Sequence, residues 1–159
     1  NRLIRENRIQ KTYLCVLTAT PSKQTDILHA YHWKDAKTNT VTISDHPKAG
    51  YREIITEYRV LQQQNGLCLA EITLHTGRTH QIRAHMAHIH APLAGDSKYG
   101  DRRKNESLHL KHQLLCAYQL QFHPEADSCL AYLNGKTVTA PLPDFVSRFF
   151  PTFSSKNRK

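Results

Sequence analysis

The chain has 159 residues, of which 39% are hydrophobic and 22% are charged, a composition typical of one globular domain and not of a disordered polypeptide. Its 22 lysines and arginines exceed its 13 acidic residues, which gives a formal net charge of +9 and a pI near 9.6. This balance favours an anionic partner, with nucleic acid first, although a basic surface that only keeps the protein dispersed would have the same composition.

The cysteines and the hydropathy of the chain further narrow the class of protein to which it can belong. The cysteines are Cys15, Cys68, Cys116 and Cys129; they form no CxxC pair, and three lie in apolar runs. We therefore expect small buried side chains of a reduced, cytoplasmic protein. No run approaches the length of a membrane span, and the polar, basic start does not resemble a signal peptide. Because the first residue is not methionine, we expect the chain to begin inside a longer protein.

The first third of the chain predicts strands. Residues 1–10 place apolar side chains among charges, as at the end of a helix, and residues 11–19 alternate as in a strand. One face of that strand would present Leu14 and Val16, and the other face would present Tyr13, Cys15 and Leu17. Residues 26–35 and 39–45 are two further strands around a polar turn at Asp35 to Asn39, and residues 46–50 are a loop.

The middle of the chain predicts a hairpin and then a helix. Residues 52–66 form a long strand that ends in Asn65-Gly66, a strong hairpin signal. The next strand, residues 67–75, would present one face made of Cys68, Ala70, Ile72 and Leu74. Thr76-Gly77 ends this strand, residues 79–90 form a helix, and Pro92 stops it.

The last third mixes loops, strands and one short helix. Residues 91–107 are a glycine-containing basic loop. Residues 114–123 are a strand with Leu114, Cys116, Tyr118, Leu120 and Phe122 on one face. Residues 129–140 contain a second hairpin turn, at Asn134-Gly135, and residues 141–150 form a terminal helix. Hairpins outnumber helices, so we predict an α+β fold on a mostly antiparallel mixed sheet, with residues 1–150 in the domain and residues 151–159 as a frayed basic tail.

The strand, turn and helix around residues 67–90 form a candidate anion site. Gly77 permits a tight turn, Thr79 is a plausible N-cap, and the first helical N–H groups point out of the helix start. One stripe of the helix contains His80, Arg83, Ala87 and His90, and an offset apolar stripe, Ile82, Met86 and Ile89, should face the core. Arg83 would then reach a carboxylate or a phosphate bidentately, or it is an ordinary surface arginine.

The sequence gives less support to a metal site, to nucleophilic catalysis or to nucleotide binding. His85, His88 and His90 have a spacing that zinc accepts, but HExxH, a nearby cysteine pair and an acidic ligand within the helix are missing. The sequence contains no GxSxG, no GxxxxGK[ST] and no GxGxxG, and no cysteine has a basic neighbourhood.

Four segments carry a family resemblance. "HTGRTHQIRAH", "APLAGDSKYGD", "LLCAYQLQFHP" and "APLPDF" follow one another in the order and spacing of the RluA-like pseudouridine synthases, which the chain resembles over about residues 5–146. Upstream, "KTYLCVL" is similar to that family's Lys-x-Tyr strand, and "REIITEYRVL" to the strand before its Thr-Gly-Arg motif. The match to the helix motif is eleven consecutive residues, which makes it specific.

The resemblance implies isomerisation of uridine in RNA, such as structured ribosomal or transfer RNA, with no metal or organic cofactor. Such enzymes extrude the base, break its N-glycosidic bond, rotate the uracil and rejoin it through carbon. A catalytic aspartate begins the reaction. The resemblance makes Tyr13 the ring that stacks on the base and accepts the final proton, and Arg83 the partner of the aspartate. Leu93 and Leu115 would help to line the base pocket. From the residues alone, Tyr13 would more often be a core aromatic.

Basic and polar side chains around these motifs are candidates for contacts with the RNA backbone. They are Lys11, Arg78, Thr79, His80, Gln81, Lys98, Arg102, Arg103 and Lys104. The last three would equally suit a solvated loop.

Two departures from the family pattern bear on these expectations. His90 occupies a position that is usually glycine, which would change the path of the loop. The family's Arg-Leu-Asp segment, followed by Thr-Ser-Gly, should lie about two dozen residues before Lys11, but only ten residues precede it and Ile4 stands where the aspartate would be needed. We therefore expect the catalytic aspartate to be missing and the chain to be inactive alone. The alternative is a non-catalytic RNA-binding protein on the same fold, and the oligomeric state stays open.

Overall fold

A computed structural model describes residues 8–154, which form one seven-stranded sheet in the order β3-β2-β4-β5-β1-β6-β7. Every pairing of these strands is antiparallel, and the predicted α+β class is confirmed. The strands are β1 (Ile9–Leu17), β2 (Thr25–Asp35), β3 (Thr40–Ser44), β4 (Arg52–Gln64), β5 (Leu67–Leu74), β6 (Leu115–Phe122) and β7 (Thr137–Thr139). The helices are α2 (Gln81–His88), α3 (Arg102–Ser107), the 3-10 turn η1 (Ala131–Leu133) and α4 (Asp144–Phe149).

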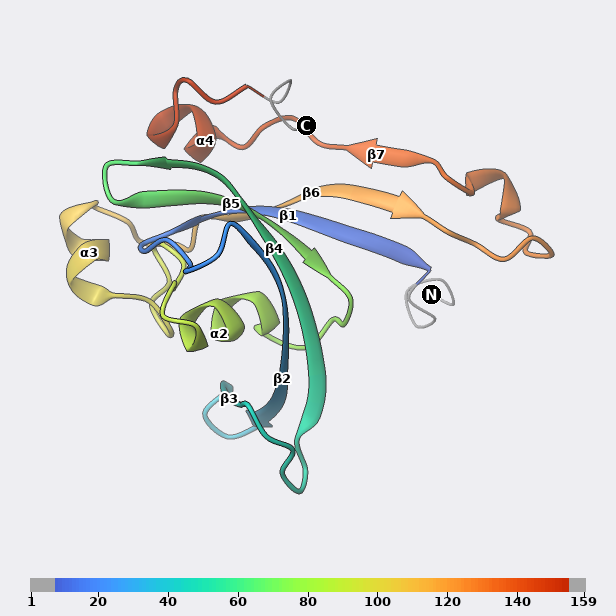
Figure 1. Ribbon diagram of the computed structural model, residues 1–159, viewed down its shortest axis with the longest axis horizontal. Coiled ribbons are helices and arrows are strands. Elements are labelled where there is room, and N and C mark those ends of the chain that lie inside the picture. The colour runs from blue at the N-terminus through green and yellow to red at the C-terminus, as the bar shows by residue number, and fades with distance from the viewer. Residues whose placement is uncertain (1–7, 155–159) are drawn as a thin grey trace.

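Strand β1, which lies between β5 and β6, has apolar side chains on both faces because a helix covers each of them. One face packs against α2 through a cluster that includes Cys15, Leu17, Ile72, Ile82 and Met86. The other face packs against α4 through a cluster that includes Leu14, Val16, Leu69, Val146 and Phe150. Figure 1 shows α2 and α4 on opposite sides of the sheet. The two faces predicted for β1 are confirmed, and so is the core-facing stripe of α2.

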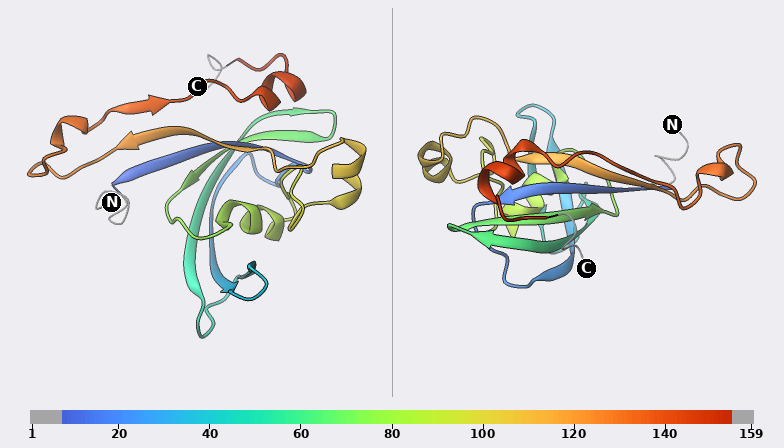
Figure 2. Two further views of the ribbon diagram at one scale, coloured as in Figure 1. Left: turned by 180° about the vertical axis from the view of Figure 1, so that it is seen from behind. Right: turned by 90° about the horizontal axis from the view of Figure 1, so that it is seen from above.

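The predicted β4–β5 hairpin is present, and its turn has the backbone that the sequence demands. Asn65 and Gly66 both adopt positive φ, 52° and 73°, which suits the right-handed twist of the flanking strands. The β2–β3 turn is closed by Asp35, whose carboxylate accepts a hydrogen bond from the backbone N–H of Lys37 at 2.8 Å. Figures 1 and 2 show β2 and β4 running past α2 toward β3, and the β6–β7 hairpin extending away from the rest of the sheet.

Two segments differ from the sequence prediction. The basic loop predicted for residues 91–107 contains α3, because the Asp101 side chain caps the helix by accepting from the backbone N–H of Lys104 at 3.1 Å. A hairpin turn was expected at Asn134-Gly135, but the residues directly before it form η1 and not a strand. The Ser128 hydroxyl accepts from the backbone N–H of Leu130 at 3.2 Å and starts that turn.

A β-bulge corrects the predicted face of β6. Thr12 pairs with Gln119 while Tyr13 pairs with Ala117, so Tyr118 is an extra residue opposite β1. The bulge reverses the alternation of β6. Tyr118 is buried against the α4 side, and Leu120 is 36% exposed and pairs with Lys11 on the other face. The five alternate residues of this strand therefore do not share one face.

The cysteines differ in their burial. Cys15 and Cys68 are buried, as expected, and burial raises the pKa of both thiols, that of Cys68 to about 12. Cys116 is half-buried and Cys129 is exposed, so the expectation of burial is wrong for Cys129, which lies in an irregular segment. Among residues 8–154, no helix has the length and apolar composition needed to cross a lipid bilayer.

The chain ends bear on two further expectations. The helix end predicted near the start of the chain falls mostly on residues 1–7, which lie outside the described residues. In the segment 151–159, Phe153 packs against the α4-side cluster, and residues 155–159 lie outside the described residues.

Candidate active site

A hollow with a volume of about 370 Å³ opens between the sheet and the start of α2. It is formed where β1, the end of β5, the turn before α2 and the start of β6 meet. Its lining residues are Tyr13, Leu74, Arg78, His80, Gln81, Ile82, Arg83, Gln113 and Leu115. The structure therefore brings Tyr13 and Arg83, which are 70 positions apart, to one cavity.

Tyr13 reaches the hollow because its position on β1 points toward α2. It pairs with Ile72 on one side and with Ala117, beside the bulge, on the other. The ring is half-buried, and this burial raises the pKa of the phenol, which keeps the hydroxyl protonated near neutral pH. The hollow therefore has a neutral aromatic ring in its wall.

Arg83 is held by a carboxylate that the sequence analysis did not select. Its Nε donates to Oδ2 of Asp96 at 2.7 Å and its Nη2 donates to Oδ1 at 2.8 Å. The side chains are 14% and 0% exposed. Burial works to raise the pKa of Asp96, but the Arg83 guanidinium and the backbone N–H groups of Tyr99 and Lys98 outweigh it and hold the pKa below its usual value. This bidentate pair fixes the plane of the guanidinium beside the hollow.

The ring of Tyr99 also contacts this guanidinium. Cζ of Arg83 lies 5.3 Å from the centroid of the Tyr99 ring, in cation–π geometry. The Tyr99 hydroxyl accepts from the backbone N–H of Val41 at 2.9 Å and lies 3.0 Å from Nδ1 of His80. Tyr99 therefore links β3, the start of α2 and the Asp96 loop.

The start of α2 is built differently from the prediction. Thr79 is not the N-cap; His80 occupies that position with a left-handed φ of 53°, and no side chain caps the helix. The Gln81 amide instead organises the turn. Its Oε1 accepts from the Thr76 hydroxyl and from the backbone N–H of Arg78, each at 3.0 Å. Its Nε2 donates across to β4, to the Ile55 carbonyl at 3.1 Å and the Thr56 hydroxyl at 3.0 Å.

The residues expected around the base pocket separate into two groups. Leu115 lines the hollow, whereas Leu93 is fully buried in the α2-side cluster and is not among the lining residues. Arg78 is exposed and lines the hollow. Gln81 also lines it, but with 2% exposure and its amide atoms bonded within the protein it holds the turn together.

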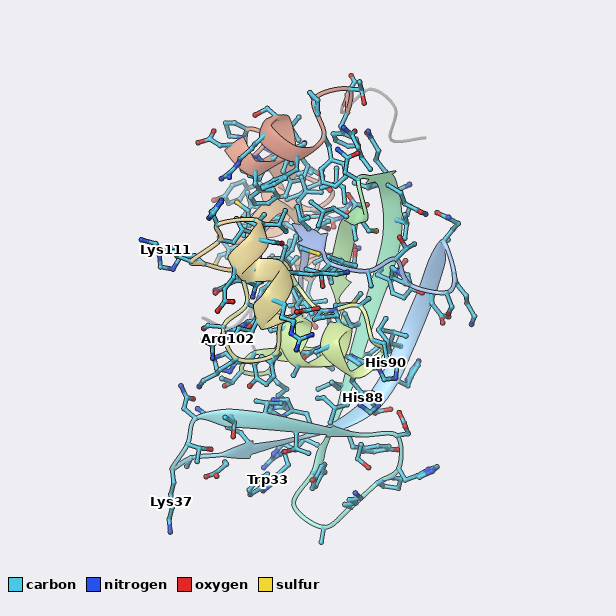
Figure 3. All side chains as sticks on the ribbon, turned by 90° about the vertical axis from the view of Figure 1, so that its left-hand side faces the viewer. Trp33, Lys37, His88, His90, Arg102 and Lys111 are labelled. Atoms are coloured by element: carbon cyan, nitrogen blue, oxygen red, sulfur yellow. The ribbon has the colours of Figure 1, made fainter. Side chains whose placement is uncertain are left out.

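His80 also lines the hollow, and the remaining RNA-contact candidates lie outside its lining. Lys11 is half-buried on β1, and Thr79 is exposed, with its carbonyl accepting from Nε2 of His32 at 2.9 Å. Nζ of Lys98 donates to the Asn39 carbonyl at 2.7 Å, and Lys104 donates to the Thr18 carbonyl. Arg102 (Figure 3) and Arg103 are exposed on α3. Arg102 pairs with Glu106 at 2.8 Å.

The histidines weighed as metal ligands point to different partners. His85 is buried and its Nδ1 lies 2.9 Å from the Thr56 hydroxyl, whereas Nε2 of His88 lies 2.7 Å from the Asp45 carboxylate. His90 follows α2 in a left-handed conformation, with φ of 61° (Figure 3). Across residues 8–154, no three His, Cys, Asp or Glu side chains are grouped so that they could hold a metal ion.

The chain is similar to known proteins both in sequence and in fold. The profile of the RNA pseudouridylate synthase family matches residues 1–88. An uncharacterized RNA pseudouridine synthase of Chloroflexus aurantiacus is 43% identical over 89 residues, which are 55% of this chain and 26% of the relative. The uncharacterized RNA pseudouridine synthase YlyB of Bacillus subtilis is 38% identical over 112 residues, 70% of this chain and 32% of the relative.

One further relative has a more specific name, and one solved structure has a similar fold. Ribosomal large subunit pseudouridine synthase D of Haemophilus influenzae is 36% identical over 118 residues, 67% of this chain and 34% of the relative. The chain thus spans about a third or less of the length of these curated relatives. Human RNA pseudouridylate synthase domain containing 1 has the same fold, with a TM-score of 0.70 at 24% identity over 92% of this chain and 60% of that one.

Proposed function

Because the chain belongs to the RNA pseudouridylate synthase family, we propose that it forms the uridine-binding part of a domain that isomerises uridine in RNA to pseudouridine. The membership confirms the RluA-like resemblance found in the sequence. In this reaction the bond from N1 of uracil to the ribose breaks and a bond from C5 forms. The proton on C5 is lost and N1 gains one, so no atom is added and no redox cofactor is required.

The observation that carries this proposal is the position of Tyr13 and Arg83 in one hollow. A uracil that has left its stack needs a flat apolar surface, and the half-buried Tyr13 ring with Leu74 and Leu115 supplies one. The phenol stays protonated, because burial raises its pKa, so it can accept the proton from C5 only if it passes its own hydroxyl proton to a neighbouring base in the same step. We assign Tyr13 to stacking and to the final proton transfer from C5.

Arg83 is assigned to the carboxylate that begins the reaction. The bonds to Asp96 use Nε and Nη2, and no described residue bonds to Nη1. A second carboxylate entering the hollow could therefore pair with Nη1 without displacing Asp96. Such pairing would keep the carboxylate ionised in a partly desolvated site.

Asp96 is itself unsuited to attack a nucleotide. Its side chain is 0% exposed; Oδ2 is bonded to Arg83, and Oδ1 accepts from Arg83 and from the backbone N–H groups of Lys98 and Tyr99. No aspartate or glutamate of residues 8–154 lines the hollow. These observations support the proposal that the chain is inactive by itself and forms a partial domain that needs a carboxylate from elsewhere in its protein.

RNA is the proposed partner, and its backbone would approach along the exposed basic side of the hollow. Arg78 lines the cavity and has no ion pair with a described residue. Five of the curated relatives are named for the ribosomal large subunit, so we propose large-subunit ribosomal RNA as the first substrate to test and transfer RNA as the second. A cytoplasmic location stays a prediction from the cysteines.

The test uses the complete natural polypeptide that contains this chain, beside the chain alone. Each is incubated with RNA that carries tritium at C5 of uridine, and the tritium released to water is measured. The complete polypeptide should release tritium and the chain alone should not. In the complete polypeptide, Tyr13→Phe and Arg83→Ala should each lower the rate by at least about a hundredfold.

Matched controls separate site effects from general damage. Tyr132→Phe changes a tyrosine that is 66% exposed in η1, and Arg148→Ala changes an exposed arginine on α4, on the other side of the sheet from α2; both should retain the rate. Tritium release by the chain alone would contradict the need for a second carboxylate. If the complete polypeptide bound RNA tightly but released none from either RNA class, the non-catalytic alternative would hold instead.

A further inference from the structure

His80 has a backbone conformation and a ring position that are unusual for a helix N-cap. Its backbone is left-handed, with φ of 53°, and its ring lines the hollow rather than capping α2. Nδ1 lies 3.0 Å from the Tyr99 hydroxyl, and the two rings meet edge to face with centroids 5.8 Å apart. No described residue bonds to Nε2, so one ring nitrogen is occupied and the other is available.

The hydrogen bonds of Tyr99 determine which nitrogen of His80 carries the proton. The hydroxyl oxygen already accepts from the backbone N–H of Val41 at 2.9 Å. The hydroxyl proton then has a single described acceptor, Nδ1 of His80, so this contact favours the tautomer in which Nδ1 is unprotonated. A neutral imidazole whose Nδ1 accepts has its proton on Nε2. In that tautomer His80 is a donor toward the hollow.

We propose that His80 contacts the substrate by donating a hydrogen bond from Nε2 to an acceptor oxygen of the nucleotide in the hollow, and that Tyr99 is the residue that positions it. This inference rests on the proposed function, because it presumes that the hollow holds a nucleotide. The acceptor is a carbonyl oxygen of the base or an oxygen of the adjoining phosphate. Both accept a hydrogen bond from a neutral N–H group.

The charges around His80 agree with a neutral ring. Burial lowers its pKa below the usual value, and the nearby cations Arg83, Lys98 and Lys34 lower it further, whereas Asp96 acts in the opposite direction. The same imidazole can therefore donate at neutral pH without bringing a third positive charge to a cavity that already contains two guanidinium groups.

The experiment measures kcat/KM for pseudouridine formation by the complete natural polypeptide with single His80 and Tyr99 variants. His80→Asn removes the donor at the Nε2 position, and since asparagine tolerates positive φ well, its effect cannot be assigned to backbone strain. It should lower kcat/KM by roughly ten- to a hundredfold. His80→Gln returns a neutral N–H near that position and should recover most of the loss. His109→Asn is the matched control, since His109 is exposed and also left-handed, with φ of 53°, and it should change nothing.

A double variant tests the positioning role of Tyr99. Tyr99→Phe keeps the ring beside Arg83 and removes only the hydroxyl, and it should lower kcat/KM by roughly three- to tenfold. In the His80→Asn background the same change should cost nothing more, because the residue that it positions is already gone. An equal cost in both backgrounds would show a purely structural role and overturn the positioning assignment.

Modified RNAs identify the acceptor. One set carries sulfur in place of a carbonyl oxygen at the target uracil, and another carries an uncharged methylphosphonate next to the target. The penalty of His80→Asn should disappear on the set that lacks the acceptor. The inference is overturned if the penalty persists on every modified RNA, or if His80→Asn retains full kcat/KM while the wild-type protein is active. Absence of pseudouridine with the wild-type protein would mark failure of the proposed function instead.

Discussion

Asp96 and Arg83 are joined by two parallel hydrogen bonds, of 2.7 Å and 2.8 Å, in a part of the protein where the carboxylate has no solvent contact. The pair connects the loop after Pro92 to the middle of α2. It therefore fixes two segments at once: the guanidinium beside the hollow and the turn at residues 96–99, whose backbone N–H groups bond to the same carboxylate.

Asp96→Asn should destabilise the protein by about 3 kcal/mol, because it leaves a guanidinium without its counter-charge in a buried site. Since the pKa of Asp96 is lowered in the folded state, its contribution is complete above the ordinary aspartate pKa of 3.8 and is lost as the pH falls through the folded value. Urea unfolding at a series of pH values checks both effects. Asp26→Asn, which breaks the exposed pair with Lys23, should change little.

His85 should make the protein sensitive to mild acid. Burial, followed by His88, lowers the pKa of His85 from 6.5 to about 4, whereas Asp45 opposes the change. The folded protein therefore binds this proton less readily than the unfolded chain, so stability is full above pH 6.5 and falls toward pH 4, by roughly 3 kcal/mol in all. The free energy of unfolding measured across this window should lose that slope in His85→Gln. His112→Gln, at an exposed histidine, should keep it.

Gly95 should tolerate no side chain. Its φ is +78°, and a Cβ would lie 2.0 Å from the carbonyl oxygen of His112. Gly95→Ala should therefore cost more than about 3 kcal/mol and shift the Asp96 loop. Gly66→Ala is the matched control, because Gly66 has φ of +73° but no atom lies within 4 Å of the place that its Cβ would take. It should cost only about 1 kcal/mol. Equal thermal midpoints for the two variants would contradict the role of the close contact.

Replacement of His90 by glycine should not lower the stability of the protein. The backbone at His90 has φ of 61°, the conformation that glycine adopts without strain. We expect His90→Gly to be neutral or to stabilise by up to about 1 kcal/mol, whereas His90→Val, with a branched Cβ, should destabilise by about 1–2 kcal/mol. Denaturant midpoints of the three proteins give the order directly. A glycine variant less stable than the valine variant would exclude this explanation.

Arg78 should contribute one phosphate contact to RNA affinity. It is exposed, lines the hollow and has no ion pair with a described residue, whereas the exposed Arg148 lies on α4, on the other side of the sheet from α2. In the complete polypeptide, Arg78→Gln should weaken RNA binding and reduce the slope of log K against log salt by about 0.7–0.9. Arg148→Gln should leave that slope nearly unchanged. Filter binding or anisotropy over a range of salt concentrations distinguishes the two results.

The sequence predicted the parts of the fold that depend on local pattern. Alternation placed Leu14 and Tyr13 on opposite faces of β1, and Asn65-Gly66 located the β4–β5 hairpin. The family motifs named Tyr13 and Arg83, and the structure places both in one hollow. Their chemical roles stay predictions, since nothing in the geometry alone assigns them.

The sequence could not predict contacts between residues that lie far apart in the chain. Asp96 lies 13 positions after Arg83, across a loop, and Tyr99 meets Val41, which is 58 positions away. No periodicity links such residues, although the "GDSKYG" segment was already part of the matched motif. Thr79 was chosen as N-cap by residue type, but the buried amide of Gln81 satisfies the turn and displaces the cap to His80. The bulge at Tyr118 arises from pairing with β1 and leaves no mark in the β6 pattern.

That bulge also determines where the length of this protein can change. Removing one residue between Leu115 and Gln119 would abolish the bulge and leave Leu120 opposite Lys11, whereas adding one would have to enlarge the bulge or turn every later side chain of β6 to the opposite face. Further along, residues 126–127 lie in a turn outside the strands and carry no such constraint. Natural variants with insertions should accordingly carry them in the second stretch and not in the first.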